Sequence, residues 1–262
     1  MRVTLFNIIS IFALFSSFTS ASAQTWWQPH DFLSWDWQLT EPYDFTRPVQ
    51  MIDLDLFETS PKTIKAFQSN GTKVICYINV GAWEDWRADA KEFPSVIIGK
   101  DYAGWEGEKW LDIRRIDLLA PIMKARMDLC AAKGFDGMEP DNMDLHWANT
   151  GFPISKQDQI RYSLWLANEA HKRGLSIGQK NAGDLASVLV AHFDWALTED
   201  CIADNWCAEM TPYVKAGKSI FAAEYTDNFQ DISPYCNKVK KHGVSLILKD
   251  RDLTKSLKIC PD

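Results

Sequence analysis

The sequence lacks the patterns that mark several common functional classes. Its 262 residues contain no CxxC or Cys/His cluster with zinc spacing, no GxSxG nucleophile motif and no glycine-rich phosphate turn. The five histidines have no metal-ligand spacing, so we expect neither a metal nor any other cofactor. Basic residues are few, with 28 Lys and Arg against 35 Asp and Glu, and the net charge of -7 argues against a nucleic-acid surface.

Long apolar runs are missing except near the start of the chain. Arg2, the apolar stretch Val3–Phe15 and the small residues Ala21-Ser22-Ala23 have the pattern of a secretory signal that is too short to span a bilayer. No later segment approaches roughly 20 uninterrupted apolar residues. We therefore expect a signal peptide, 1–23, and a mature domain, 24–262, that is secreted, extracellular and not attached to a membrane.

The six cysteines are an even number in a chain expected to pass through an oxidising compartment. This predicts structural disulfides and not metal or redox chemistry. The pairing is open from the sequence alone, but two pairs, Cys201 with Cys207 and Cys236 with Cys260, would each close a short local loop.

Short apolar runs alternate with helical patterns along the mature chain, and glycine stops such as Lys133-Gly134 end several of these patterns. Strands are predicted at Ser34–Trp37, Val49–Leu56, Lys73–Asn79, Gly137–Pro140, Ser176–Asn181, Trp195–Glu199, Ser219–Tyr225 and Val244–Asp250. Helices are predicted at Pro61–Ser69, Ala120–Ala132, Lys156–Lys172, Trp206–Ala216 and Ser233–Lys241. The alternation favours an α/β fold, a single-domain (β/α)8 TIM barrel, over an open doubly wound sheet.

Polar side chains recur where the predicted strands end. Active sites of α/β barrels lie at the carboxyl ends of the strands, and an apolar strand has no packing use for an ionised carboxylate. The side chains in question are those of Asp36, Asp53, Asp55, Tyr77, Asn79, Glu139, Asp141, Asn142, Lys180, Asn181, Glu199, Glu224, Tyr225, Lys249 and Asp250. We interpret them as the lining of one site.

A ring of carboxylates with few basic residues is typical of glycoside cleavage, where one carboxylic acid protonates the leaving oxygen and a second carboxylate acts as nucleophile or base. The 12 tryptophans offer stacking surfaces for sugars. Two groups of them are candidates for such a groove: Trp26, Trp27, Trp35 and Trp37 near the mature start, and Trp83, Trp86, Trp105 and Trp110 after the third strand.

Two motifs at strand ends are diagnostic, Glu139-Pro140-Asp141-Asn142 and Glu199-Asp200-Cys201. Together with segments 73–79, 84–89, 110–114, 150–153, 178–181 and 223–225, they resemble glycoside hydrolase family 114, the endo-α-1,4-polygalactosaminidases. The resemblance extends from about Trp35 to Tyr225. It implies a (β/α)8 barrel that cuts internal α-1,4 linkages of galactosamine-containing polysaccharide, such as partly deacetylated galactosaminogalactan of fungal walls and biofilms.

The same resemblance places the catalytic acids at Asp141, the nucleophile candidate, and Glu199, the general acid/base candidate. Which of the two plays which role is open, and Glu139 is a rival for the role of Asp141. Substrate-binding candidates are Asp36, Asp53, Asp55, Tyr77, Trp86, Asp112, Glu139, Asn142, Lys180, Asn181, Glu224 and Tyr225.

The negative net charge of the chain agrees with a cationic substrate. Without residues 1–23, which contain one Arg, the chain has 27 basic and 35 acidic residues and a charge of -8. The expected partner is a galactosamine-containing polysaccharide, with no nucleic acid and no membrane, bound by a monomer. Two alternatives remain: an inactive carbohydrate-binding barrel, and a barrel glycosidase for neutral α-galactosides.

Overall fold

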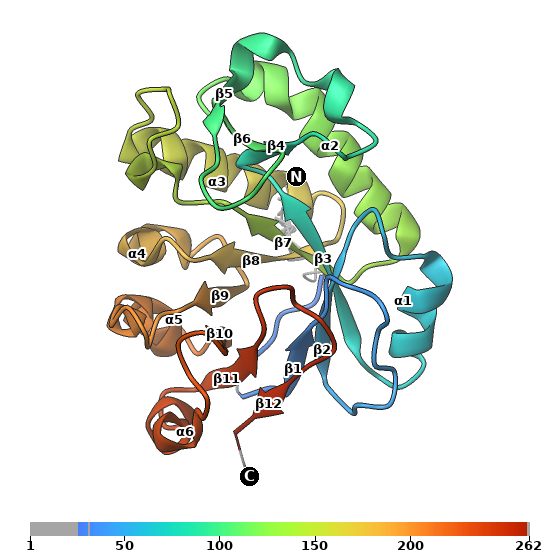
Figure 1. Cartoon of the computed structure of the whole chain (residues 1–262), viewed down its shortest axis with the longest axis vertical. Coiled ribbons are helices and arrows are strands. Elements are labelled where there is room, and N and C mark those ends of the chain that lie inside the picture. The colour runs from blue at the N-terminus through green and yellow to red at the C-terminus, as the bar shows by residue number, and fades with distance from the viewer. Residues whose placement is uncertain (1–25, 31, 261–262) are drawn as a thin grey trace, which may run out of the picture.

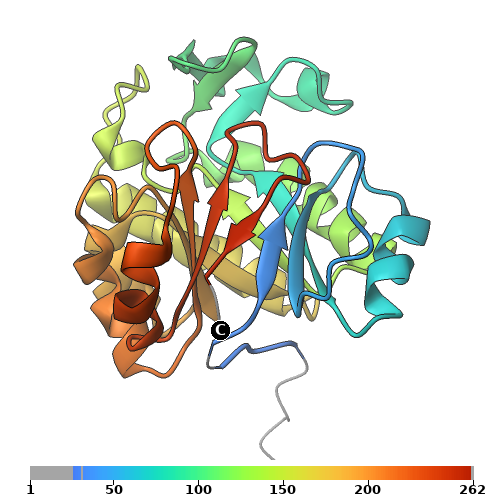
Figure 2. The same ribbon diagram turned by 60° about the horizontal axis from the view of Figure 1, so that its bottom comes forward.

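The protein is built on a curled, mostly parallel sheet, seen from two directions in Figures 1 and 2. This computed structural model describes residues 26–30 and 32–260, so the predicted signal peptide, 1–23, lies outside the described residues. The order of the strands is β1 (Trp35–Trp37), β2 (Met51–Asp55), β3 (Lys73–Asn79), β7 (Gly137–Asp141), β8 (Ser176–Lys180), β9 (Trp195–Glu199), β10 (Ile220–Tyr225), β11 (Val244–Lys249) and β12 (Lys258–Ile259). All neighbours from β1 to β11 pair in parallel, and β12 pairs antiparallel with β11. The predicted strands are all present, each within two residues of its expected bounds.

The first and last of the parallel strands, β1 and β11, meet through side chains. Among the described residues no backbone ladder joins these two strands. Instead, Trp35 Nε1 donates to the carbonyl oxygen of Ser245 at 2.9 Å, and the Lys249 ammonium lies 2.9 Å from Asp36 Oδ1. Both partners of this ion pair are fully buried, and Asp36 has a second cationic partner in the Arg47 guanidinium.

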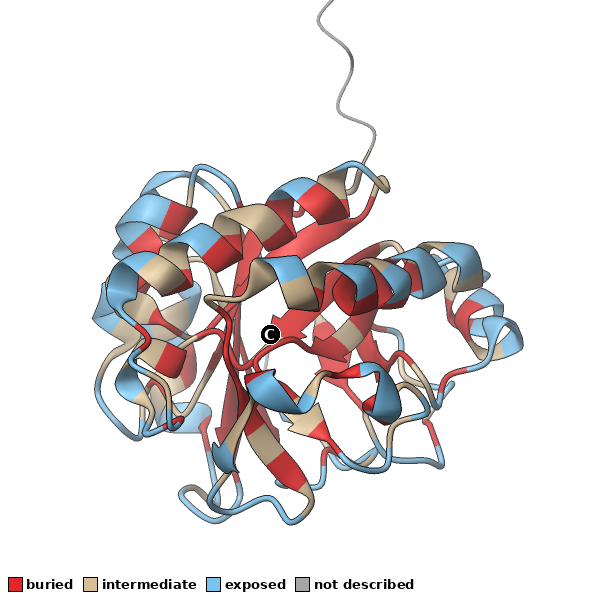
Figure 3. Ribbon diagram, turned by 90° about the horizontal axis from the view of Figure 1, so that it is seen from above, coloured by how far each residue is buried: buried red, intermediate tan, exposed pale blue. Residues whose placement is uncertain are grey.

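Helices cover the outside of the sheet. In Figure 3 most residues of the parallel strands are buried, whereas the helices carry both buried and exposed residues. Their bounds are α1 (Pro61–Gln68), α2 (Ile116–Lys133), α3 (Lys156–His171), α4 (Ala186–Leu189), α5 (Thr211–Lys215) and α6 (Ser233–Lys240). The helix expected over 206–216 is instead a 3₁₀ turn, η5 (Cys207–Met210), followed by α5. Pro212 lies in the first turn of α5, because proline lacks the N–H that a helix interior needs. Within the described ranges, no helix has the length and apolar character needed to cross a membrane.

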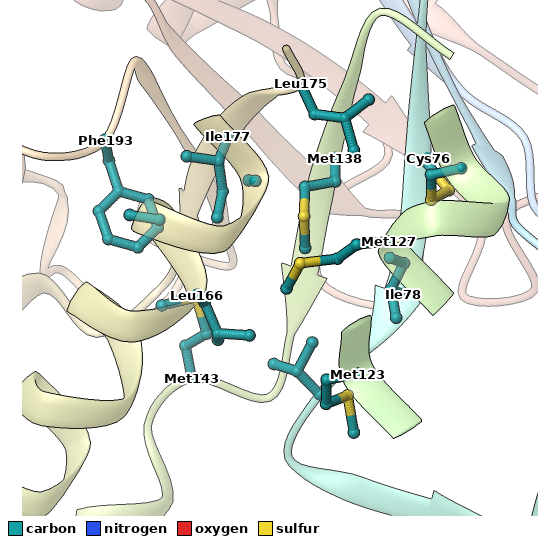
Figure 4. Packing of buried hydrophobic residues seen from close by; sticks show 14 of the residues in the cluster. Cys76, Ile78, Met123, Met127, Met138, Met143, Leu166, Leu175, Ile177 and Phe193 are labelled. Carbon is teal, nitrogen blue, oxygen red and sulfur yellow. A yellow bond between two sulfur atoms is a disulfide. The ribbon is translucent and has the colours of Figure 1, made fainter. Parts of the chain in front are cut away.

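The larger apolar cluster lies between the sheet and the helices. Figure 4 shows Met127 of α2, Met138 of β7 and Leu166 of α3 within this layer. One of the three disulfides, Cys76–Cys130, joins β3 to α2 here, with 6.1 Å between the Cα atoms. The other two, Cys201–Cys207 and Cys236–Cys260, are the local pairs that the sequence favoured, so that prediction is confirmed.

A second apolar cluster, the inner cluster, fills the inside of the curled sheet with aromatic rings. Trp35, Trp37, Trp195 and Phe221 belong to it. Gly178 makes room for this packing, because a Cβ atom on Gly178 would lie 2.2 Å from the Trp195 ring. The inner cluster is apolar, and the charged side chains of these strands lie toward their carboxyl ends.

A small antiparallel sheet follows β3 and was not predicted. It has the order β4 (Ala82–Glu84), β6 (Glu108–Leu111) and β5 (Ile98–Asp101). In Figure 2 it stands above the end of the parallel sheet. Because β4 begins directly after the carboxyl end of β3, this insertion rises from the edge where barrel active sites lie.

Candidate active site

The centre of the site is the buried ammonium group of Lys180, the last residue of β8. Its Nζ atom lies 2.7 Å from Glu139 Oε1, 2.7 Å from Asp141 Oδ1 and 3.0 Å from Glu199 Oε2. The Trp37 ring lies beneath, 4.5 Å from Nζ. Burial alone would lower the pKa of Lys180, but the three carboxylates outweigh it and raise that pKa well above its usual value. The site is thus held together by one permanent positive charge.

Asp141 ends β7 and is surrounded by hydrogen-bond donors. Lys180 contacts Oδ1, while the Tyr77 hydroxyl donates to Oδ2 at 2.9 Å and Asn142 Nδ2 donates to the same oxygen at 3.3 Å. A carboxylate only accepts hydrogen bonds, so this set of donors suits an ionised side chain of fixed orientation.

Glu199 ends β9 and is held by a similar set of donors. The Tyr225 hydroxyl donates to Oε1, and Asn181 Nδ2 donates to Oε2 at 3.1 Å. The Asn181 side chain also accepts from the backbone N–H of Glu199 at 2.9 Å, so one amide orients both the strand end and the carboxylate.

The backbone turns in the same way after each of the three central residues. Asn142, Asn181 and Asp200 directly follow Asp141, Lys180 and Glu199, and they have positive φ angles of 60°, 45° and 51°. Asn and Asp tolerate this left-handed region better than other residues with a Cβ atom. The three turns end the strands and leave the functional side chains at the edge of the barrel.

Burial separates Glu139 from the other two carboxylates. The Glu139 side chain is 0% exposed, while those of Asp141 and Glu199 are 20% and 26% exposed. Pro140 does not turn Glu139 and Asp141 apart, because both contact the same Nζ atom. Glu139 is a rival of Asp141 in sequence, but only Asp141 and Glu199 are open to a ligand.

These carboxylates lie on the floor of a cleft of about 960 Å³. Twelve Asp and Glu side chains line it, against three basic side chains, Arg87, Lys180 and Arg251. Across the described part of the chain, no group of three or more His, Cys, Asp or Glu side chains could hold a metal ion. The cleft therefore presents Asp141 and Glu199, the two accessible carboxylates of the Lys180 cluster, in a strongly negative surface.

Comparison with known proteins identifies the family to which this chain belongs. A family model described as glycoside-hydrolase family GH114 matches residues 16–262. The chain belongs to family GH114. It is a glycoside hydrolase, and the resemblance carried by the strand-end motifs is confirmed.

Other proteins resemble this GH114 chain over nearly its whole length. The crystal structure of Aspergillus fumigatus Ega3 in complex with galactosamine is 31% identical, with a TM-score of 0.85 over 94% of this chain and 100% of that one. The glycoside hydrolase domain of PelA from Pseudomonas aeruginosa shares the fold at 13% identity, with a TM-score of 0.72 over 87% of this chain and 99% of that one. An uncharacterized protein of Thermotoga maritima is 25% identical over 281 residues, 90% of this chain and 85% of that protein. The predicted single-domain α/β barrel is confirmed by the Ega3 match.

Seven of the predicted substrate-binding residues line the cleft of this GH114 enzyme: Asp55, Tyr77, Trp86, Asn142, Lys180, Asn181 and Tyr225. Asp55 also has a structural partner, because it accepts two hydrogen bonds from Arg87, at 3.0 Å and 2.7 Å. Four of the seven, namely Tyr77, Asn142, Asn181 and Tyr225, donate to one of the two accessible carboxylates.

Five other predicted residues are not among those lining the cleft, namely Asp36, Asp53, Asp112, Glu139 and Glu224. Asp36 binds Lys249 between β1 and β11, and Asp112 binds the Arg114 guanidinium at 2.7 Å and 2.8 Å. Glu224 accepts from the backbone N–H groups of Ile202 and Ala203 at 2.7 Å and 3.2 Å, and so anchors the loop after β9. Asp53 and Glu139 lie beneath Lys180, fully buried.

The tryptophans divide in a way that the sequence did not predict. Trp37, Trp86 and Trp105 line the cleft, whereas Trp35 and Trp110 are core residues. Trp147 and Trp206, which the sequence analysis passed over, also line the cleft. Trp147 is 73% exposed, and its position shortly after the Asp141 motif is the signal that could have identified it.

Burial raises the pKa of several carboxyl groups in or near the site, and three of the shifts are large. Burial raises the pKa of Glu108 to about 8, and those of Glu139 and Glu224 to about 7 each. The ordinary value for Glu is 4.5, so the folded state binds more protons than the unfolded state from about pH 4.5 to about pH 8. The free energy of unfolding contributed by these groups must therefore fall as the pH rises through this window.

We expect the melting temperature to be higher near pH 5 than near pH 8. Glu108→Gln should reduce this difference, because an amide cannot ionise yet can still accept the hydrogen bond from Asn79. Thermal unfolding followed by circular dichroism across this pH range is the measurement. Glu106→Gln, the same change on an exposed neighbour, serves as the control and should leave the difference intact. A melting temperature that rises from pH 5 to pH 8 would contradict the argument.

Proposed function

We propose that this protein is a secreted, endo-acting glycoside hydrolase that cleaves α-1,4-galactosaminidic linkages in galactosamine-rich polysaccharide by a two-carboxylate mechanism. The observation that carries the proposal is the pair Asp141 and Glu199, partly exposed on the floor of an acidic cleft and bridged by Lys180. Membership of family GH114 and likeness to Ega3, whose crystal structure contains galactosamine, support the reaction and the substrate class.

The charge of the cleft supports a cationic polymer. Galactosamine units with a free amine are largely protonated near neutral pH, and twelve carboxyl groups against three basic side chains create a negative potential over the whole cleft. Exposed tryptophans, Trp86, Trp105 and Trp147, add aromatic faces on which sugar rings stack.

The spacing of the two carboxyl groups supports a retaining mechanism. Because Lys180 Nζ lies 2.7 Å from Asp141 and 3.0 Å from Glu199, the nearest oxygens of the two groups are at most 5.7 Å apart. Retaining glycosidases have a separation of roughly 5–5.5 Å, whereas inverting enzymes need roughly 6.5–9.5 Å for an intervening water. On the family resemblance we assign Asp141 as the nucleophile, oriented by Lys180 and Tyr77, and Glu199 as the general acid/base, oriented by Tyr225 and Asn181.

In the first step Glu199 gives its proton to the glycosidic oxygen while Asp141 bonds to the anomeric carbon and the leaving chain departs. In the second step Glu199 takes a proton from water, whose oxygen displaces Asp141 and restores the free carboxylate. One of the two groups is negative in each state, Asp141 before the first step and Glu199 in the covalent intermediate, and Lys180, which contacts both, can compensate either charge.

The decisive test compares wild type with Asp141→Asn and Glu199→Gln on galactosaminogalactan of defined acetylation. We expect the wild type to release oligosaccharides whose new reducing ends are initially α-anomers by NMR, and each variant to lose at least about 10³-fold in kcat. Asp128→Asn, the same change on the exposed face of α2, is the matched control and should be fully active.

Circular dichroism of every variant would confirm that it folds like the wild type. Binding without cleavage by wild type would support the inactive carbohydrate-binding barrel. An initial β-anomer would overturn the retaining assignment while leaving the hydrolase proposal in place.

Salt and acetylation provide a second test, because attraction between an acidic cleft and a cationic polymer is screened by ions. We expect the initial rate at low substrate to fall several-fold between about 0.05 M and 0.5 M NaCl, and to fall with increasing acetylation of the polymer. A rate that depends on neither, together with turnover of neutral α-galactosides, would favour the alternative glycosidase.

Secretion and a monomeric state are parts of the same proposal. Three disulfides support passage through an oxidising compartment. We expect the protein recovered from a culture medium to begin at Gln24 and to sediment as a single monomeric species. A cell-retained product that keeps Met1, or a sedimentation mass near twice that of one mature chain, would contradict these two expectations.

A further inference from the structure

Two buried carboxyl groups beneath Lys180 have oxygen atoms that accept no hydrogen bond from a side chain. Asp53 on β2 and Glu139 on β7, strands on either side of β3, are both 0% exposed. No side chain among the described residues donates to either oxygen of Asp53 or to Glu139 Oε2, and the backbone N–H of Leu54 has only a minor lowering effect on the pKa of Asp53. The remaining oxygen, Glu139 Oε1, accepts from the Lys180 ammonium at 2.7 Å.

The two groups are within hydrogen-bonding reach of each other, with the Trp37 and Trp195 rings in the same apolar cluster below. Carboxylate oxygens only accept hydrogen bonds, so two ionised groups in contact would leave both charges partly unpaired in an apolar environment. A single proton between them removes this conflict, because a carboxylic acid O–H donates to a carboxylate. Burial, followed by the neighbouring Glu139 charge, raises the pKa of Asp53 well above its usual value, in agreement with that arrangement.

The geometry also indicates which partner holds the proton. Glu139 contacts the Lys180 ammonium, which favours the ionised form of Glu139. Asp53 has no cation within ion-pair distance among the described residues, so the proton belongs on Asp53. Its O–H then points to Glu139 Oε2, and Oε1 is left facing Lys180.

We propose that Asp53 and Glu139 share one proton, and that this pair positions the Lys180 ammonium between Asp141 and Glu199. The proposal rests on the proposed function only in assigning Asp141 and Glu199 as the catalytic pair. Asp53 and Glu139 are positioning residues, since neither reaches the cleft. Without the proton, Glu139 is repelled by Asp53 and loses the orientation that directs Oε1 to Lys180. Lys180 in turn loses one of its three carboxylate contacts.

Two substitutions of similar size separate this role from simple packing. Asp53→Asn keeps a donor, because the amide N–H can replace the acid O–H toward Glu139. Asp53→Leu fills the space but leaves Glu139 Oε2 without a donor. We expect kcat of Asp53→Asn to stay within about three-fold of wild type, and kcat of Asp53→Leu to fall roughly 10- to 100-fold with little change in KM, as expected when catalytic groups are displaced.

Infrared spectroscopy tests the proton directly and needs no substrate. At pH 7 the wild-type spectrum should contain a C=O stretching band of a buried carboxylic acid that is missing from Asp53→Asn. Other raised-pKa groups, such as Glu108 and Glu224, contribute to both spectra and cancel in the difference. Loss of the band together with retained activity is the expected result.

An unchanged band, or an Asp53→Asn variant as impaired as Asp53→Leu, would overturn the shared proton and its positioning role. If Asp53→Leu does not fold, the infrared difference and the activity of Asp53→Asn still decide the question. If wild type cleaves no galactosamine polymer but the band is lost in Asp53→Asn, the proposed function fails and the proton pair stands.

Discussion

The active site depends on one interaction, the bridge between the Lys180 ammonium and three carboxylates. Each component would be unfavourable alone, since a buried unpaired charge costs several kcal/mol. Glu139, Asp141 and Glu199 keep Lys180 charged despite its burial, and Lys180 allows the three carboxylates to lie close together. Adjacent parallel strands, β7, β8 and β9, bring the four side chains to one edge of the barrel.

The inner aromatic cluster supports this polar layer from below. Trp37 lies beneath Lys180, and the gap that Gly178 leaves on β8 is occupied by Trp195. Trp35, Trp37, Trp195 and Phe221 are almost fully buried, so the polar layer rests on a surface of low polarity, which strengthens its electrostatic interactions. Asp53 and Glu139 lie where the aromatic cluster meets the polar layer. The proposed proton sharing suits this position, because a second full negative charge there would have no counter-ion.

Above the polar layer, an insertion and its loops shape the cleft of this barrel. The β4–β6–β5 insertion carries Glu108, while the loops around it carry Trp86 and Trp105. The PelA domain retains the fold at 13% identity, so the barrel itself tolerates extensive substitution. What the proposed function requires is local: two accessible carboxylates, a bridging cation and an acidic cleft with aromatic surfaces.

Much of this could be predicted from sequence because it is encoded locally. Apolar runs with glycine stops located every parallel strand, strand-end polarity identified Asp141, Lys180 and Glu199, and short spacing gave two disulfides. Tertiary structure alone decided which strand-end carboxylates face the cleft. Asp36 and Asp53 have the same sequence signature as Asp141, yet one is paired with Lys249 and the other lies under Lys180. The Cys76–Cys130 pairing and the three-stranded insertion were hidden for the same reason: contacts between distant segments determine them, and no local pattern records which segments will meet.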